Sequence, residues 1–358
     1  MPPKSRRVET APLCRAILDL VFGCLSHADV LCVAYLVCSA WSAGRATWCE
    51  LRAKTAAQCQ KLISLCHPTK VLAVVVMRER LNVSRLQEIC ARLPQVASLN
   101  LRLHSASVPG LHDFSGLREL DICVALTDDG FAALCNLITL ESLSVDDCFD
   151  KVSNTSFRHL GNLTNLRSVT FVRCLNLDVT ALGTVTSLQD FGLHDVDLAA
   201  LVFDEVCTCI ASWAFLQVLV LSHTDADVSH FAILGTSHSI TTLRLVNETQ
   251  VYVSALRAIA GLASLRHLEF EHCMEVADLC PLEKLPLLES LSLLNCNERI
   301  SYHTIKRLAA IPTLASLRLQ HFRDAFHCDA LFDAFLRGLG YTVTRPKDLV
   351  VAERVVPK

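Results

Sequence analysis

One spacing of apolar residues recurs along the sequence and limits what the chain can fold into. The nine residues LESLSVDDC begin at Leu140, and the similar LESLSLLNC begins at Leu288. A search for an apolar residue followed by others three and five positions later gives eleven starts, separated by 25, 21, 23, 26, 22, 28, 24, 25, 23 and 26 residues. The starts are Val71, Val96, Leu117, Leu140, Leu166, Leu188, Leu216, Ile240, Leu265, Leu288 and Leu314. This period predicts a stack of similar units.

Each unit is expected to contain a short strand and then a helix. Alternation places Leu143 and Val145 on one side of a strand and Ser144 on the other. About ten residues further on the apolar period becomes helical, as in SNTSFRHLGNL and SYHTIKRLAAI. Ser84 followed by Gln87 predicts a capping box, and four further serines stand where a helix N-cap is expected: Ser153, Ser229, Ser254 and Ser301.

The repeats resemble cysteine-containing leucine-rich repeats. The ninth position of the pattern, which turns inward after the strand, holds Cys148, Cys174, Cys273 and Cys296. A thiol there fills a small buried site and donates a weak hydrogen bond, so these cysteines are predicted to be structural. The predicted fold is an α/β leucine-rich-repeat solenoid, curved, with parallel strands on the concave face, helices outside and a small N-terminal helical cap.

The stretch before the repeats, PLCRAILDLVFGCLSHADVLCVAYLVCSAWSAGRATWCEL from Pro12, resembles an F-box. The resemblance implies an adaptor whose helices dock on the Skp1 subunit of a cullin-RING ubiquitin ligase while the repeats hold a protein substrate. The residues that it places on the docking surface are Leu13, Ile17, Leu18, Phe22, Leu25, Leu31, Val37 and Trp41. The alternative is that these helices only cap the exposed end of the solenoid.

The predicted domain organisation follows from these assignments. Residues 1–10 form a flexible N-terminus, residues 11–66 the F-box-like cap, residues 67–337 about eleven repeats, and residues 338–358 the end of a C-terminal cap and a tail. The stretch DALFDAFLRGLGYTV predicts a last helix that buries Leu331, Phe332, Phe335 and Leu336, and the residues from Arg345 onward are expected to form a charged, mobile tail.

The outward strand positions predict a binding surface on the concave face. They form an acidic stripe made of Glu119, Asp121, Asp146, Asp147, Asp190, Asp195, Glu269 and Glu271, with scattered arginines. Such a stripe favours a basic or mixed-charge partner. Alternatively, these are simply solvated strand residues.

Histidine and asparagine alternate at the last exposed position of five consecutive repeats: His223, Asn247, His272, Asn295 and His321. Histidines on alternate strands would lie roughly 10 Å apart, too far to share one metal ion. The column is therefore interpreted either as a pH-sensitive or hydrogen-bonding recognition strip or as an ordinary polar surface.

Composition narrows the remaining function classes. Residues 1–70 carry nine Lys and Arg against four Asp and Glu (+5), and the rest carries 24 against 32 (−8), which gives little reason to expect nucleic acid on the larger part. The longest apolar run, VLCVAYLVC, is far below the roughly 20 residues of a membrane span. Eighteen dispersed cysteines favour a reduced compartment, cytoplasm or nucleus, with the mitochondrion still open.

Enzyme motifs are absent from the sequence: it contains no G-x-G-x-x-G, no phosphate-binding loop, no H-E-x-x-H and no G-x-S-x-G. The expected partners are proteins, with no cofactor, metal, membrane or small-molecule substrate. The predicted function is thus a non-catalytic F-box adaptor. The alternative is a structural or assembly subunit of a large complex, which could be organellar, with the solenoid as its scaffold.

Overall fold

The computed structural model describes residues 50–53, 55, 57, 60, 73–93, 95–103, 111, 114, 116–147, 152, 153, 155–174, 183, 185, 187–196, 200–296, 300–320, 329–346 and 349–354. The eight F-box-like docking residues, Leu13 to Trp41, lie outside these ranges, as do Cys148 and His321. What the sequence predicts for them stays a prediction.

The described strands form one 14-stranded sheet, in the order β1 to β12, then β14 and β13. Strands β1 to β12 pair in parallel with their neighbours along the chain. Every strand from β2 to β12 begins two residues after a predicted repeat start, so all eleven starts are confirmed. Their bounds are Glu50–Ala53, Ala73–Leu81, Ser98–Leu103, Glu119–Cys123, Ser142–Asp146, Ser168–Val172, Asp190–His194, Val218–Ser222, Thr242–Val246, His267–Glu271, Ser290–Leu294 and Ser316–Gln320.

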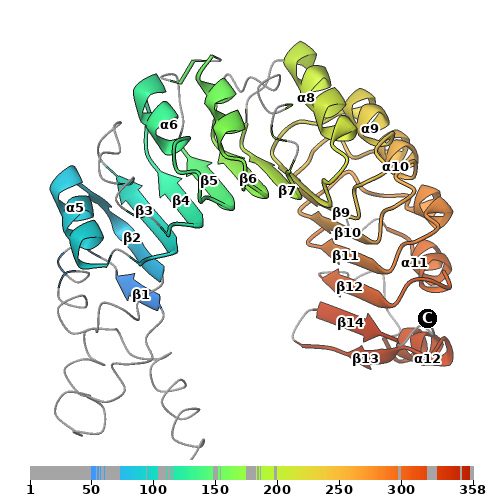
Figure 1. Cartoon of the computed structure of the whole chain (residues 1–358). Helices are drawn as coiled ribbons and strands as arrows, with labels where there is room; N and C mark the ends of the chain where they lie inside the picture. The colour runs from blue at the N-terminus through green and yellow to red at the C-terminus, as the bar shows by residue number, and fades with distance from the viewer. Residues whose placement is uncertain are drawn as a thin grey trace, which may run out of the picture.

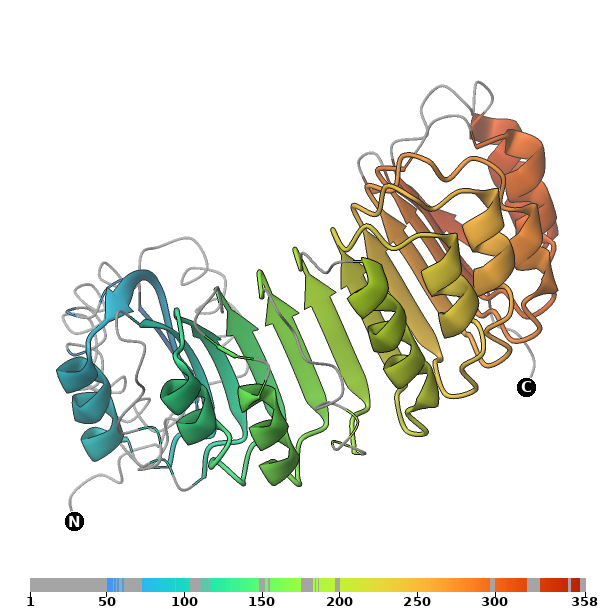
Figure 2. The same cartoon turned by 90° about the horizontal axis from the view of Figure 1, so that it is seen from above.

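Helices lie on the outer side of the arch, and the strands line its inner side (Figures 1 and 2). The helices are α5 (Val83–Arg92), α6 (Asp128–Leu134), α8 (Ala200–Ser212), α9 (Val228–Leu234), α10 (Val253–Ile259), α11 (Tyr302–Ala309) and α12 (Asp329–Gly338), with 3-10 turns η4 (Ser156–Asn162) and η5 (Cys280–Lys284). The fold is therefore the predicted α/β leucine-rich-repeat solenoid. None of the described helices is long and apolar enough to cross a bilayer.

The helix starts differ in part from the predicted ones. Ser301 is the N-cap of α11, as predicted, and accepts a hydrogen bond from the Thr304 N–H at 3.1 Å. The capping box predicted at Ser84 is wrong, because Asn82 caps α5 two residues earlier. A capping box does form at α9, where Asp227 accepts backbone N–H groups and the His230 side chain reaches back to Asp227. The N-caps predicted at Ser229, Ser254 and Ser153 are also wrong, because Asp227, Tyr252 and Thr155 hold the N-cap positions of α9, α10 and η4.

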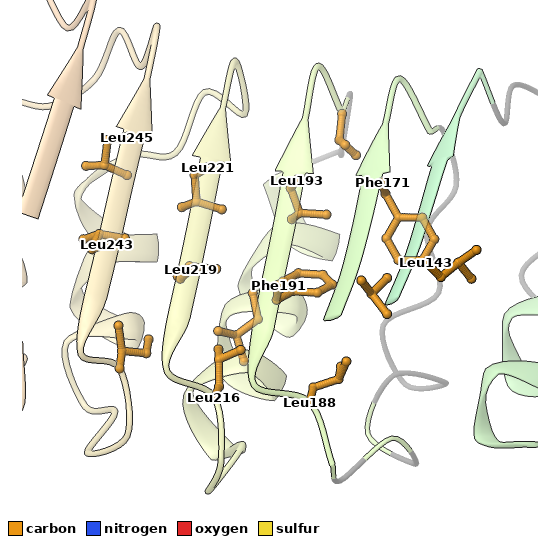
Figure 3. Packing of buried hydrophobic residues seen from close by; sticks show 14 of the residues in the cluster. Leu143, Phe171, Leu188, Phe191, Leu193, Leu216, Leu219, Leu221, Leu243 and Leu245 are labelled. Carbon is orange, nitrogen blue, oxygen red and sulfur yellow. The ribbon is translucent and has the colours of Figure 1, made fainter. Parts of the chain in front are cut away.

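The core consists of apolar side chains stacked in register from strand to strand. Leu193 pairs with Leu221, and Leu221 with Leu245, and all three are buried between the sheet and the outer layer (Figure 3). Each is covered by the coil before it and the coil after it. Because no single coil buries both edges of its own apolar layer, stability arises mainly from stacking.

Aromatic rings fill the part of the core between α6 and α8. Phe131, Phe157, Phe171, Phe191 and Trp213 contact one another in that order, with ring centroids 5.0, 5.8, 6.4 and 5.1 Å apart, all edge to face. In this part η4 replaces a full α-helix. The large aromatic rings thus fill the core in coils whose outer segment is a short 3-10 helix and not a longer α-helix.

Both ends of the sheet depart from the sequence-based prediction. Glu50–Ala53, expected within the helical cap, form β1, which extends the parallel sheet. The predicted mobile tail is wrong, because Leu349–Glu353 form β14 and pair antiparallel with β12, while β13 (Thr342–Thr344) pairs with β14. In α12, Phe332 and Leu336 are buried as predicted, but Leu331 is exposed.

Arg354 fastens this C-terminal end. Its Nε donates to the Leu314 carbonyl at 2.7 Å and its Nη2 to the Pro312 carbonyl at 3.0 Å. The guanidinium lies 4.7 Å from the centre of the Tyr341 ring, and the Tyr341 hydroxyl also donates to Leu314 at 2.7 Å. These bonds satisfy carbonyls that another coil would otherwise cover.

Replacing Phe171 with alanine should lower the free energy of unfolding by about 3–5 kcal/mol, because it removes a fully buried ring and leaves a cavity between two others. The matched control is Phe215→Ala, since Phe215 is 63% exposed and its loss should change stability by less than about 0.5 kcal/mol. Urea unfolding followed by circular dichroism measures both. Equal losses for the two variants would contradict the assigned core.

Candidate binding surface

The inner side of the arch carries ordered columns of side chains, here called the concave sheet face. In five-residue strands such as β5 and β6, the first, third and fifth residues point to this face and are partly exposed, while the second and fourth are buried. The parallel register aligns these positions, so that Ser144 pairs with Thr170 and Thr170 with Gly192. The sequence therefore places up to three side chains per strand on one continuous surface.

A turn of left-handed backbone follows most of these strands. The residue directly after the strand has positive φ at Asp147, Arg173, Asp195, His223, Asn247, His272 and Asn295. Its N–H donates to the last strand residue of the next coil, as from His223 to Val246 (3.1 Å) and from Asn247 to Glu271 (2.8 Å). Asn, Asp and His are enriched at positive φ. The described histidines and asparagines of the predicted strip occupy these turns, so backbone geometry accounts for their residue types.

The described members of this strip contact at most one neighbouring polar side chain each in the pairs that follow. His223 Nδ1 lies 3.1 Å from Asp195 Oδ1, and His272 Nε2 lies 3.4 Å from Asn295 Nδ2. Within the described ranges, no group of three His, Cys, Asp or Glu side chains is placed to hold a metal ion. The predicted strip thus consists of neighbouring pairs.

Where the structure describes it, the residue after this left-handed turn points inward, as predicted for the cysteine column. Cys174, Cys273 and Cys296 are buried, and their thiols donate to carbonyls of the preceding coil, including Leu245 at 3.3 Å and Phe270 at 3.4 Å. Burial raises the pKa of Cys273 to about 12 and that of Cys296 to about 11. At neutral pH these thiols are protonated hydrogen-bond donors and poor nucleophiles.

Glu248 occupies the same inward position in the coil of β9, where it is 1% exposed. Its Oε1 accepts from the Thr224 N–H and hydroxyl, both at 2.9 Å, and Oε2 accepts from the Ala226 N–H at 3.3 Å. Burial raises the pKa of this carboxyl, and the bonds from Thr224 oppose that rise. Glu248 therefore serves the turn of the preceding coil and faces away from the concave sheet face.

Ion pairs between coils neutralise much of the predicted acidic stripe. Asp146 pairs with Arg173 at 2.5 Å, Asp147 with Arg80 at 3.3 Å, and Glu269 with Arg244 at 2.7 Å. Asp195 Oδ1 lies 3.1 Å from Nδ1 of His223, and Glu271 Oε1 lies 4.0 Å from Nε2 of His272. Each such surface pair contributes roughly 0–1 kcal/mol to stability, but it also cancels the field that a partner would meet.

Three predicted carboxylates form no ion pair with any described basic residue: Glu119, Asp121 and Asp190. Asp121 accepts a hydrogen bond from Asn100 Nδ2 at 2.6 Å. Burial raises the pKa of Asp121, and repulsion from Asp146 adds to that rise, while Arg102 and a hydrogen bond from Ser144 oppose it. Burial also raises the pKa of Asp190. Among the described residues of the predicted stripe, the carboxylates outside ion pairs thus lie on β4 and β7.

A shallow depression of about 430 Å³ lies on the concave sheet face over β2 to β5. Two of the unpaired carboxylates, Glu119 and Asp121, line it. The lining is completed by Val75, Ser98, Leu99, Asn100, Leu120, Ser142 and Ser144. The sequence-based search missed the serines and Asn100 because it singled out only the carboxylates of the strands and the column of histidines and asparagines. The signal was present, since each of them stands at an outward position of a predicted strand.

The centre of the concave sheet face is less polar. On β8 the outward residues Val218 and Val220 are half-buried, and Gly192 of β7 lies between Val220 and Thr170. A side chain at Gly192 would meet the Thr170 side chain, since an added Cβ would lie 3.1 Å from its Oγ1. A partly apolar centre with charged groups on both sides is a common composition for protein interfaces.

Comparison with known proteins gives likeness in fold. No protein-family model and no curated protein matches the sequence. Among solved structures, an internalin (inlF) from Listeria monocytogenes is similar with a TM-score of 0.45 and 16% identity, covering 79% of this chain and 85% of its own. TLR13 in complex with ssRNA13 gives 0.46 and 16%, covering 72% and 37%. Internalin C2 (inlC2), also from Listeria monocytogenes, gives 0.35 and 22%, covering 51% and 72%.

Replacing Glu248 with alanine should lower the free energy of unfolding by about 1–3 kcal/mol, because the N–H groups of Thr224 and Ala226 would lose their acceptor in a buried site. Urea unfolding measures the change. Glu275→Ala removes an exposed glutamate from the following coil and should change stability by less than about 0.5 kcal/mol. If both variants unfold at the same urea concentration, Glu248 has no structural role in the turn.

Proposed function

We propose that this chain is a non-catalytic recognition protein whose concave sheet face binds a protein partner. The carrying observation is the continuous surface of parallel strands, on which alternate side chains are partly exposed and which no described helix or strand covers (Figure 1). Eleven strands at about 4.8 Å each span on the order of 50 Å, enough for a folded partner or a long extended segment.

The rigidity of this surface supports a binding role. Strand register, inward hydrogen bonds from the cysteine column and the stacked core hold the outward side chains in fixed columns. A partner then meets side chains that lose little further conformational freedom on binding. The half-buried Val218 and Val220 offer apolar contact at the centre, and the charged groups around them would set orientation.

The finer proposal assigns residues 11–66 to docking on a Skp1-type subunit of a cullin-RING ubiquitin ligase. Its support is the sequence resemblance to an F-box and the position of that segment directly before the repeats. In this proposal the concave sheet face holds the substrate, and the partner subunits supply the catalytic chemistry. The proposed partners are proteins, and the expectation that nucleic acid does not bind stays a prediction.

Affinity purification tests both arms with separate variants. The wild-type chain should recover a Skp1-type protein, a cullin and a substrate protein. The double change Leu25→Asp with Phe22→Ala should lose the first two and keep the third, because it removes apolar anchors of the F-box-like segment. Thr170→Arg with Val220→Arg should lose only the substrate protein, because it places two long charged side chains on the concave sheet face.

Glu205→Arg is the matched control for the concave change, since it adds an arginine to the exposed side of α8, and it should keep every partner. Circular dichroism must show that all variants remain folded. If the wild-type chain recovers a stable set of other proteins without Skp1 or cullin, the ligase role is wrong and the chain is a scaffold. If the Thr170 and Val220 change retains every partner, the concave sheet face is not the binding surface.

A further inference from the structure

The concave sheet face differs along its length in whether its carboxylates are compensated. Asp146, Asp147 and Glu269 are paired with arginines, and Asp195 lies beside a histidine. Glu119 and Asp121 form no ion pair with a described basic residue, although Arg102 lowers the pKa of Asp121 through a weaker electrostatic interaction, and they are the two carboxylates that line the depression over β2 to β5. The carboxylates outside ion pairs and the hollow in the surface therefore coincide.

The strand register explains how the depression forms around these carboxylates. Glu119 on β4 lies between Ser98 of β3 and Ser142 of β5. Asp121 lies between Asn100 and Ser144 in the same two strands. Serine is short, so it leaves room beside each carboxylate at the strand spacing of about 4.8 Å. Its hydroxyl adds a hydrogen-bonding group to the wall.

The electrostatics of the depression favour a cation. Asp121 is half-buried. Burial and the nearby Asp146 raise its pKa, and Arg102 opposes this rise only in part. Glu119 is exposed on the same face of β4, two residues away, or roughly 7 Å along the strand. A positive group placed between them would interact with both carboxylates in a partly desolvated site, where such contacts are stronger than on an open surface.

We propose that the depression over β2 to β5 receives an arginine or lysine side chain of the protein partner. This inference rests on the proposed binding role of the concave sheet face. The positively charged head contacts Glu119 and Asp121, and the hydroxyls of Ser142 and Ser144 lie beside it. The aliphatic stem packs against Val75, whose side chain lines the same depression. The depression thus selects the partner segment by its basic residue, and the rest of the face adds contact area.

The test uses two short peptides that differ only in charge. Acetyl-Gly-Arg-Gly-amide carries the guanidinium, and the same peptide with citrulline carries its neutral isostere. Methyl resonances of Val75, Leu99 and Leu120 in the full chain report occupancy, since all three residues line the depression. The arginine peptide should shift these signals to saturation, and the citrulline peptide should bind about tenfold more weakly, as expected for the loss of one charge-assisted hydrogen bond.

Matched variants then locate the effect. Glu119→Gln with Asp121→Asn should weaken the arginine peptide by about tenfold or more. Asp190→Asn removes another unpaired carboxylate of the concave sheet face three strands away and should leave the affinity unchanged. The proposal is overturned if the arginine peptide leaves the three methyl signals unshifted, if citrulline binds equally well, or if Asp190→Asn weakens binding as much as the double change.

These outcomes are separate from those that test the proposed function. Suppose that the wild-type chain recovers its substrate protein, that the Thr170 and Val220 variant loses it, and that the arginine peptide does not bind. The concave sheet face then keeps its binding role. In that case the depression alone is misassigned. A chain whose concave changes retain every partner has no recognition role for this face, whatever the peptide does.

Discussion

No coil of this chain can bury its own apolar residues from both sides, and the other features of the structure follow from that constraint. Stacking forces strands such as β7, β8 and β9 into exact parallel register, which sorts side chains into a buried layer and an exposed layer. At the C-terminal end β14 adds an antiparallel strand, and Arg354 and Tyr341 satisfy carbonyls that no further coil reaches.

The way each strand ends determines which polar residues follow it. After β5 to β11 the chain turns through positive φ, and the next residue, where described, is buried, with Cys174, Cys273 and Cys296 hydrogen-bonding the coil before them. Asp, Asn and His are tolerated at the first position, and the second position is buried and holds a cysteine, threonine, glutamate or valine. Cys273, Thr224 and Glu248 fill that second position in different ways. Many of the polar and thiol side chains that follow the strands thus have structural roles.

The sequence predicted the repeated part of the fold well and the ends poorly, for a physical reason. Starts such as Leu140 and Leu288 are visible because two-residue alternation and the repeat length report a local pattern that stacking reinforces. Strand β14 was missed because Leu349–Glu353 become a strand only through pairing with β12. Thr127 and Asp227, which cap helices, were missed because several polar residues compete near each helix start.

The candidate surface was predicted in position but not in charge. Its residues were found one strand at a time, whereas Arg244 and Glu269 pair across neighbouring coils, 25 positions apart. Counting carboxylates therefore overestimated the acidity of the stripe, and among the described residues of the stripe Glu119, Asp121 and Asp190 form no ion pair, with Arg102 acting on Asp121 only through a weaker electrostatic interaction. The depression was not predictable from the sequence, because it depends on how short serines stand beside longer side chains in three adjacent strands.

Site-specific photo-crosslinking tests the central claim, that the concave sheet face is the recognition surface, most directly. A photoreactive amino acid would be placed at Thr170 on the concave sheet face and, in a second protein, at Glu205 on the outer helical layer. The account predicts that the Thr170 position crosslinks to one defined protein partner and that the Glu205 position does not. A partner crosslinked from Glu205 alone would contradict it and would move recognition to the outer side of the solenoid.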